Sequence, residues 1–326
     1  KFVELNIVDF TKEKALKNYC VIVNPVSAMG AGRKAIPKIE KYLQALGLEY
    51  DLLITDYPGH AIDLAAMAGS SGCSTVVAVG GDGTVNEVIN GLMRALNLGC
   101  LSANLAVLPV GRGNDFSFGM GVPQNLEAAC QVLVEGKLKT IDIGFVWGGD
   151  YPEGRYFGNG VGIGFDTIVG FEAAKLPSFL SGIPAYLIAA IKTIFLYFNA
   201  PLLRIHLDDT MIEQPCLLVS LMNGKRMGGS FLFAPDSSPD DGLLSLCIVK
   251  QLTRLQILGL FPKVIAGKHI HHQGVSMLNA QRVRLEALIG KMPVHADGET
   301  VCEAGQDLEV YILKKKLQML SEESQC

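Results

Sequence analysis

The chain has 326 residues, of which 49% are hydrophobic and 18% are charged. This length allows two domains with separate cores, and the composition excludes a largely disordered protein. The net charge of −4 at pH 7 gives no overall basic surface, so we predict no nucleic-acid partner. The eight cysteines are scattered without a Cys-x-x-Cys pair, and residues 1–18 mix polar and charged types. These features favour a reducing cytosol and predict neither a disulfide framework, a zinc site nor a signal peptide.

The first half of the chain alternates between strand and helix patterns. Residues 19–23 (YCVIV) form the first predicted strand, a short apolar run typical of a strand buried on both faces. The pattern continues with helix 33–46, strand 50–55, helix 61–68, strand 75–79, helix 84–96, strand 105–109, helix 125–135 and strand 140–146. This alternation with short turns predicts a parallel, doubly wound α/β sheet, whose ligands bind beyond the carboxyl ends of the strands.

A glycine-rich turn follows the strand at 75–79. Gly80, Gly81 and Gly83 allow the backbone to approach a ligand closely, and the next helix begins with unpaired N–H groups that attract phosphate. Asp82 lies between these glycines and would repel a polyphosphate unless a divalent cation or a basic side chain intervenes. The turn therefore indicates a nucleotide with Mg2+, although a single glycine cluster is more often an ordinary tight turn.

Three later segments also concentrate polar residues. Residues 109–116 (PVGRGNDF) place glycines, an amide and a carboxylate after a strand, and residues 235–243 (PDSSPDDGL) gather oxygen ligands suited to a hard cation. Residues 295–299 (HADGE) carry two carboxylates around a glycine. Turn chemistry explains each segment taken singly. Asn24, Thr55, the glycine-rich turn and residues 111–115 all lie at the carboxyl ends of predicted parallel strands, and convergence of these loops at one sheet edge indicates a binding site more strongly than any one loop.

The second half of the chain predicts a mainly β, sandwich-like domain. Its predicted strands are 155–161, 202–208, 216–222, 242–249, 275–278 and 282–288, and its predicted helices are 183–198 and 253–267. A last strand at 308–313 is compatible with a return to either domain.

Two features of this half concern membranes. The apolar helix at 183–198 is shorter than the roughly 20 residues that span a bilayer, and it contains Lys192, so we expect a buried or membrane-touching helix. Residues 245–295 hold seven Lys or Arg, four His and a single acid, Glu286. Such a basic stretch fits an anionic membrane surface and fits a solvated face equally well.

Several motifs occur in a fixed order: Asn24-Pro25, GGDGTVNE at 80–87, GxGNDF at 111–116, IDIG at 141–144, YFGNGVGIGFD at 156–166, the stretch 223–243 with Gly228-Gly229, and Asp297-Gly298-Glu299. Over residues 19–313 the chain thereby resembles the diacylglycerol kinase catalytic-domain family, in its bacterial soluble branch of diacylglycerol and sphingosine kinase-like enzymes. The resemblance implies a Rossmann-like nucleotide domain of the NAD kinase/diacylglycerol kinase type, residues 1–145 and 305–326. It also implies a β-rich lipid-substrate domain, residues 146–304, with the active site in the cleft between the two.

The resemblance assigns roles to individual residues. It implies Glu299 as the proton acceptor, Asp142 as a supporting carboxylate, and Asp82 in the Mg2+ and phosphate network. It implies a structural Mg2+ site made by Asp241 with backbone oxygens of Ser238 and Leu243. The implied nucleotide contacts are Asn24, Pro25, Ser27, Thr55, Gly81, Asp82, Gly83, Thr84, Asn86 and Glu87, joined by Gly111, Arg112 and Asn114 of the second loop.

Arg112 departs from the family pattern, because the family commonly has threonine at this position. A threonine hydroxyl would contact phosphate, whereas Arg112 reaches it as a cation or points to solvent. Arg33 and Lys34 are further candidates for phosphate contacts, since the loop before them is less basic than in some family members.

The resemblance implies a Mg2+-dependent kinase that transfers the γ-phosphate of ATP to the hydroxyl of a diacylglycerol-like membrane lipid, in the cytoplasm at the inner face of the membrane. An NAD kinase-like or phosphofructokinase-like enzyme acting on a soluble metabolite is the alternative, because those families share the Gly-Gly-Asp-Gly loop. A nucleotide-binding regulator without catalysis is a second alternative. The sequence predicts neither the particular lipid nor the oligomeric state.

Overall fold

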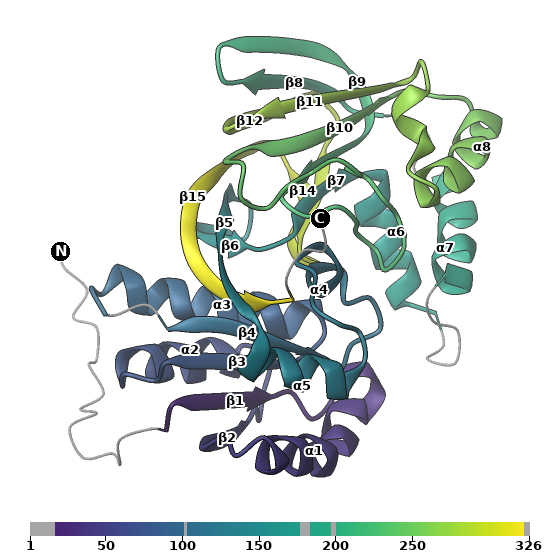
Figure 1. The fold of residues 1–326 in the computed structure, drawn as a ribbon. Helices are drawn as coiled ribbons and strands as arrows, with labels where there is room; N and C mark the ends of the chain where they lie inside the picture. The colour runs from purple at the N-terminus through teal and green to yellow at the C-terminus, as the bar shows by residue number, and fades with distance from the viewer. Residues whose placement is uncertain (1–16, 101–102, 177–182, 197–199, 323–326) are drawn as a thin grey trace.

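The computed structural model describes residues 17–100, 103–176, 183–196 and 200–322. An α/β domain and a β-rich domain lie one above the other, and the yellow strand β15 runs between them (Figure 1). The mixed α/β architecture with a second, sandwich-like domain confirms the fold class predicted from the sequence.

The α/β domain is built on a parallel sheet with the strand order β2-β1-β3-β4. These strands are β1 Tyr19–Val23, β2 Tyr50–Ile54, β3 Thr75–Gly80 and β4 Asn104–Pro109. The central strand β3 is buried along its whole length, as expected for an apolar strand covered on both faces. The helices pack in two pairs, α1 with α5 and α2 with α3. Their bounds are α1 Ser27–Ala45, α2 His60–Ser70, α3 Asp82–Asn97 and α5 Leu126–Glu135.

The β-rich domain folds as antiparallel strands in two layers that share one long strand. Strand β9 pairs with β8 through residues 210–215 and with β7 and β10 through residues 216–222, so it passes from one layer to the other. The first part of the domain contains β5 Lys137–Gly148, β6 Tyr151–Phe157, β7 Gly160–Gly164, β8 Leu202–Leu207, β9 Thr210–Met222 and β10 Leu244–Lys250. The last part contains β11 Val275–Ala280, β12 Arg282–Ile289, β13 Met292–Ala296, β14 Glu299–Gly305 and β15 Asp307–Ser321.

Three helices cover one side of this sandwich (Figure 1). They are α6 Phe165–Ala174, α7 Ile183–Leu196 and α8 Arg254–Ile265, with a short 3-10 helix at Lys268–His271. Their inner residues share a separate apolar core with the sandwich, including Phe165, Ile194 and Leu260. Among the described residues no helix is both long and apolar enough to cross a bilayer.

Strands β5 and β15 connect the two domains. Leu308 and Val310 of β15 belong to the core of the sandwich, whereas Leu317 and Met319 of the same strand belong to the core of the α/β domain. The β15–β5 register shifts between Leu313 and Leu317, where the strand leaves one core for the other. Because both strands cross from core to core, the two domains are joined by continuous hydrogen-bonded structure and not by a loose linker.

The structure differs locally from the predicted elements. The helix predicted at 33–46 is preceded by residues 28–30, which have positive φ and form a turn within the α1 segment. The strand predicted at 155–161 is two strands, β6 and β7, and the short helix α4 Asp115–Gly119, helix α6 and strands β13 and β14 were not predicted. The strand predicted at 308–313 continues to residue 321. The predicted end of the helix at 183–198 falls outside the described residues.

Candidate functional site

The site begins at the carboxyl edge of the parallel sheet, where β1, β3 and β4 end together. Val23 lies opposite Val79, and Gly80 opposite Pro109, so the segments that follow these strands are neighbours. A Cβ on Gly111 would lie 2.4 Å from the Cα of Gly81. Only glycine permits this approach, and the two glycine-rich loops therefore form one continuous surface.

Asn24 connects the end of β1 to helix α3. Its side-chain nitrogen donates to Thr84 Oγ1 at 3.0 Å, and its side-chain oxygen accepts the N–H of Val26 at 3.1 Å. The neighbouring Ser27 hydroxyl is buried without a hydrogen-bond partner in the described structure. A buried polar atom without a partner is costly, so a ligand that supplies one would bind favourably at this loop.

Two carboxylates, Asp82 and Asp115, flank Gly113. A Cβ on Gly113 would lie 3.0 Å from Asp82 Oδ2 and 3.6 Å from Asp115 Oδ2. Burial, reinforced by the charge of Asp115, raises the pKa of Asp82 to about 6. Burial also raises the pKa of Asp115. Two crowded, desolvated carboxylates of this kind suit a divalent cation with oxygen ligands.

Both carboxylates are fixed by groups from other loops. Asp82 Oδ1 accepts the N–H of Phe116 at 2.9 Å, and Asp115 Oδ2 accepts the N–H of Gly229 at 2.7 Å. Arg226 forms an ion pair with Asp115, with Nε 2.8 Å from Oδ1. Gly229 and Arg226 come from the β-rich domain, so that domain helps to complete the carboxylate pair.

Glu299 of the β-rich domain lies next to the glycine-rich turn of the α/β domain. It is the first residue of β14, is partly exposed, and its Oε1 lies 3.0 Å from the position of a Cβ on Gly83. The turn before it consists of Asp297 and Gly298, both with positive φ. Glu299 is therefore 216 positions away from Gly83 in the sequence and adjacent to it in space.

The buried carboxylate of Asp297 fixes this turn through four hydrogen bonds. Its Oδ1 accepts the N–H groups of Asn159 and Gly160 at 3.0 and 2.9 Å, and its Oδ2 accepts the N–H of Gly158 at 2.7 Å and the side-chain amide of Asn86 at 2.9 Å. The side chain is 8% exposed, and all four bonds go to a charged acceptor. Asp297 thus ties helix α3 of the α/β domain to the strands of the β-rich domain.

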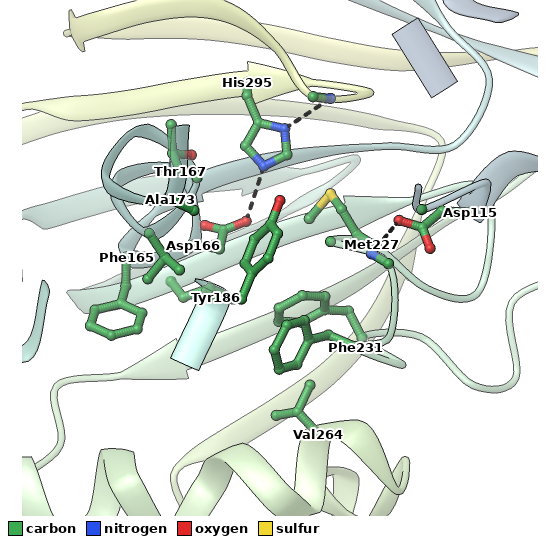
Figure 2. A pocket seen from close by; sticks show the side chains of 18 of the residues that line it. Asp115, Phe165, Asp166, Thr167, Ala173, Tyr186, Met227, Phe231, Val264 and His295 are labelled. Atoms are coloured by element: carbon green, nitrogen blue, oxygen red, sulfur yellow. Dashed lines mark hydrogen bonds and ion pairs between the residues drawn. The ribbon is translucent and has the colours of Figure 1, made fainter. Parts of the chain in front are cut away.

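A cavity of about 560 Å³ leads away from this polar cluster. Asp82, Gly83, Asp115 and Glu299 lie among its polar lining residues. Its remainder is mostly apolar and includes Phe165, Val169, Leu217, Leu218, Met227, Phe231, Phe233, Ile257, Leu260, Phe261 and Val264. Figure 2 shows Phe231 and Val264 at the apolar end and Asp115 at the polar side. Such a cavity accommodates a molecule with one reactive polar group and a long apolar body.

A histidine–carboxylate pair forms another wall of the cavity. His295 Nδ1 accepts the N–H of Gly298 at 3.3 Å, so its Nε2 carries the proton and faces Asp166 Oδ2 at 3.4 Å. Tyr186 extends toward this pair (Figure 2). Burial and the charges of Asp115, Asp166 and Asp82 raise the pKa of the Tyr186 hydroxyl, which keeps it neutral.

The structure brings most of the predicted site residues together. The segments that follow β3 and β4 and the turn before β14 meet at the polar end of the cavity, and the segment that follows β1 lies beside them. Thr55 follows β2 at the same sheet edge, and its N–H donates to Val23 O at 2.9 Å. Arg112 is exposed and lies along the cavity wall. The predicted residues gathered at this sheet edge are Asn24, Pro25, Ser27, Thr55, Gly81, Asp82, Gly83, Thr84, Gly111, Arg112, Asn114 and Glu299. Of these, Asp82, Gly83, Arg112 and Glu299 line the cavity.

Two predicted nucleotide contacts have other partners in the structure. Asn86 is completely buried and bonds to Asp297, Tyr156 and Arg155, which leaves no free side-chain group for a nucleotide. Glu87 accepts the N–H groups of Gly59 and Ala61 at 2.9 and 3.1 Å and so caps the start of α2. Both are polar residues of α3, but their side chains face neighbouring elements and not the loop edge.

Asp142 also has hydrogen-bond partners within the protein. It is 0% exposed, and its carboxylate accepts the N–H groups of Gly242 and Lys315, both at 2.6 Å. Lys315 has φ +51 at the point where β15 shifts register. In this geometry Asp142 holds the junction of β5 and β15 and does not line the cavity, in contrast to the supporting active-site role predicted from the resemblance.

The predicted structural metal segment is a turn next to Asp142. Asp241 is exposed and its Oδ1 accepts the N–H of Leu243 at 2.9 Å, while Ser238 donates its hydroxyl to Asp240 at 2.6 Å. Within the described ranges no three His, Cys, Asp or Glu side chains gather as a metal site. A site with one carboxylate and two backbone oxygens does not need such a cluster, so it stays a prediction.

Sequence reasoning assigned no individual role to four charged or polar residues that shape the cavity: Asp115, Asp166, Tyr186 and Arg226. Asp115 and Asp166 each end a glycine-rich motif, GxGND and GVGIGFD, which is a signal visible in the sequence. Tyr186 lies in an apolar helix pattern and Arg226 in an irregular loop, so neither had such a signal.

Comparisons with known proteins give matches to both halves of the chain. Residues 18–146 match the family model of the diacylglycerol kinase catalytic domain, and residues 159–320 match that of the YegS C-terminal NAD kinase beta sandwich-like domain. The chain is 29% identical over 290 residues to a diacylglycerol kinase of Bacillus subtilis (strain 168), covering 87% of this chain and 90% of the relative. It is 29% identical over 283 residues to a diacylglycerol kinase of Mycobacterium tuberculosis (strain ATCC 25618 / H37Rv), covering 86% of this chain and 88% of the relative.

A solved structure shares the whole architecture. The crystal structure of a protein from Bacillus anthracis str. Sterne, provisionally named a diacylglycerol kinase, superposes with a TM-score of 0.73 at 27% sequence identity. The match covers 95% of this chain and 98% of that chain. The similarity therefore extends over both domains.

Proposed function

Because this chain belongs to the diacylglycerol kinase catalytic-domain family and is therefore a kinase, we propose that it transfers the γ-phosphate of ATP to the hydroxyl of a diacylglycerol-like membrane lipid. The relatives named diacylglycerol kinase in Bacillus subtilis and Mycobacterium tuberculosis support this substrate class. We place the reaction in the cytoplasm, at the inner face of the membrane, where ATP and such a lipid meet.

One observation carries the proposal: the polar cluster of Asp82, Asp115 and Glu299 opens into an apolar cavity. A lipid with a single hydroxyl fits this division, with its hydroxyl at Glu299 and its acyl chains among residues such as Phe231 and Leu260. A nicotinamide dinucleotide or a sugar phosphate is polar along its whole length, and the apolar lining would leave its polar groups without hydrogen bonds.

The glycine-rich loops are proposed to bind the phosphates of ATP. The N-terminus of α3 directs unpaired N–H groups and a positive dipole end toward the loop edge, with no side chain on Gly81 or Gly83 in the way. Ser27 contributes its unpartnered hydroxyl, and Arg112 on the cavity wall adds a positive charge.

The carboxylates fit a divalent cation. Asp82 and Asp115 approach the same point beside Gly113, and burial together with the charge of Asp115 raises the pKa of Asp82, so a cation bound between them would offset the cost of keeping both carboxylates ionised. We propose that these two residues hold Mg2+, which supplies charge neutralisation at the transferring phosphate. The turn at Ser238, Asp241 and Leu243 is proposed as a second, structural Mg2+ site that stabilises the backbone donating to Asp142.

Glu299 is proposed as the general base. Its carboxylate lies over Gly83, next to the loop that is proposed to hold the phosphates, and it is within the cavity that would hold the lipid hydroxyl. It accepts the hydroxyl proton as the oxygen attacks the γ-phosphorus, and ADP leaves with the electrons of the broken P–O bond. His295 and Asp297 hold the turn that presents Glu299 to this position.

A labelling experiment tests the reaction class directly. Purified protein with Mg2+ and radiolabelled ATP is offered diacylglycerol, a total membrane lipid extract, NAD or fructose 6-phosphate in separate reactions, and the products are identified by mass spectrometry. We expect label in the lipid fraction and none in NAD or the sugar phosphate, and Asp82→Asn serves as the control for contaminating kinases. Label in NAD would favour the soluble-metabolite alternative. ATP binding without transfer to any lipid would favour a non-catalytic regulator.

A further inference from the structure

The outer surfaces of helices α7 and α8 carry a concentration of exposed apolar side chains. Of the twenty large hydrophobic residues that are exposed in the described part of the chain, seven lie on these two helices. We call them the docking face: Leu187, Ile188, Ile191 and Phe195 on α7, and Leu255, Leu258 and Ile265 on α8. Phe195 is 68% exposed and Leu255 is 81% exposed, so most of the surface of each residue is in contact with solvent. Clustered exposure of this kind marks an interaction surface.

The two helical contributions form a single surface. Leu187, Ile188, Ile191 and Phe195 recur at one, four and eight positions after the first, which places them on one side of α7. The helices lie next to each other at the edge of the molecule (Figure 1). Arg254 at the start of α8 joins them, because its Nε donates to Ile194 O at 3.4 Å and its guanidinium lies over the ring of Phe195, 5.3 Å from the ring centre.

The opposite sides of the same helices line the lipid cavity. Tyr186 of α7 and Leu260, Phe261 and Val264 of α8 face inward to it, and Figure 2 shows Tyr186 and Val264 on the cavity wall. These two helices therefore form a wall with the docking face on its outside and the cavity on its inside. An apolar molecule that passes between them moves from one apolar environment to the other.

The charges around the docking face are positive. Residues 243–281, which include α8 and its flanking segments, contain four Lys or Arg and not one Asp or Glu, and α7 has no acidic residue. Lys192 and Lys263 lie exposed on the two helices, and Glu172, the acid beside α7, is paired with Lys175 and Lys192. A second copy of this chain on the same face would bring like charges together, whereas an anionic lipid surface complements them.

We propose that the docking face inserts into the boundary between headgroups and acyl chains of an anionic bilayer, and that the lipid substrate enters the cavity from there between α7 and α8. The inference rests on the proposed function for the identity of the cavity's occupant. Helices with an apolar face and flanking cations lie in this boundary with about 5–10 Å of penetration. The polar cluster at Asp82 and Glu299 then stays on the aqueous side, where ATP is available.

Vesicle binding tests the docking face independently of catalysis. The full chain is sedimented with vesicles of phosphatidylcholine alone or of phosphatidylcholine mixed with phosphatidylglycerol, as wild type and as the double variant Ile191→Glu/Leu255→Glu. We expect the wild type to prefer the anionic vesicles and the double variant to lose at least about tenfold in the partition coefficient. The matched control Ile289→Glu places the same charge on a residue of β12 that is 68% exposed and should bind as the wild type does. Equal binding of the double variant and the wild type would overturn the proposal.

Activity on two forms of substrate separates this inference from the proposed function. The double variant should phosphorylate a short-chain diacylglycerol dissolved in buffer at the wild-type rate and lose activity only on lipid embedded in anionic vesicles, because neither substituted residue lines the cavity. If the wild type binds anionic vesicles through this face but phosphorylates no lipid in either form, the proposed function fails and the docking face stands. If sedimentation velocity shows a wild-type dimer that the double variant dissociates, while vesicle binding is unchanged, the face joins two copies and the proposal is wrong.

Discussion

Asp297→Asn tests how strongly the active-site turn depends on one buried carboxylate. Asparagine has the same shape and tolerates the φ of +49 at this position, so the backbone is preserved and the change is one of charge and hydrogen bonding. Each carboxylate oxygen accepts two N–H groups, and the amide nitrogen of asparagine would face two of these donors with a donor of its own.

The loss of two bonds to a buried charge at about 1.5–3 kcal/mol each predicts that the free energy of unfolding falls by about 3–6 kcal/mol. For a chain of this size that corresponds to a drop of roughly 10 °C in Tm, measured by scanning calorimetry. Asp208→Asn is the matched control: Asp208 has φ +47 and accepts the N–H groups of Gln281 and Arg282, but it is exposed. We expect this control to cost less than about 1 kcal/mol. If Asp297→Asn also lowers the free energy of unfolding by less than about 1 kcal/mol, the reasoning that burial strengthens the hydrogen bonds of Asp297 is refuted.

Glu299→Gln should lower kcat by about 100- to 10,000-fold in the lipid phosphorylation assay while ATP affinity measured by calorimetry is unchanged, and wild-type turnover in this variant would contradict its role as base. Without metal ion, the free energy of unfolding should fall as pH rises from about 4 to about 6, because the raised pKa of Asp82 makes the folded state bind its proton more tightly than the unfolded state. Denaturant titrations across this range should show a smaller pH dependence in Asp82→Asn and in Asp115→Asn, and an unaltered slope in both would count against the carboxylate pair. Gly111→Ala should weaken ATP binding by at least about tenfold, because its Cβ would contact the neighbouring loop backbone at 2.4 Å. Gly259→Ala, where a Cβ meets nothing within 4 Å, should leave ATP binding intact, and equal effects of the two alanines would exclude a steric cause.

Local patterns were sufficient to predict the elements of the α/β domain and one edge of the site. The apolar runs of β1, β3 and β4 are short, lack polar interruptions and lead into Asn24, Gly80 and Gly111, so both the strands and the position of their carboxyl ends follow from the sequence. The register of parallel strands then forces the loops after them together. For the same reason the sequence alone predicts Asp82 at this edge of the sheet.

The β-rich domain was less predictable because its strands depend on partners distant in the sequence. β13 and β14 are short, mix polar and apolar residues, and take their places by pairing with β7 and with each other. The three consecutive lysines at 314–316 obscure the continuation of β15, whose two halves belong to different cores. Neither pattern can be read from a local window of the sequence.

The sequence by itself determined which chemistry is available: a glycine-rich phosphate loop, the carboxylates Asp82 and Glu299, and a family membership carried by ordered motifs. Only the tertiary structure decided what each polar residue does. Asn86, Glu87 and Asp142 resemble site residues in the sequence, but their side chains are bonded within the protein, whereas Asp115 and Asp166 line the cavity. The physical reason is that a side chain's role depends on which donors and charges surround it, and in this fold those come from segments many residues away.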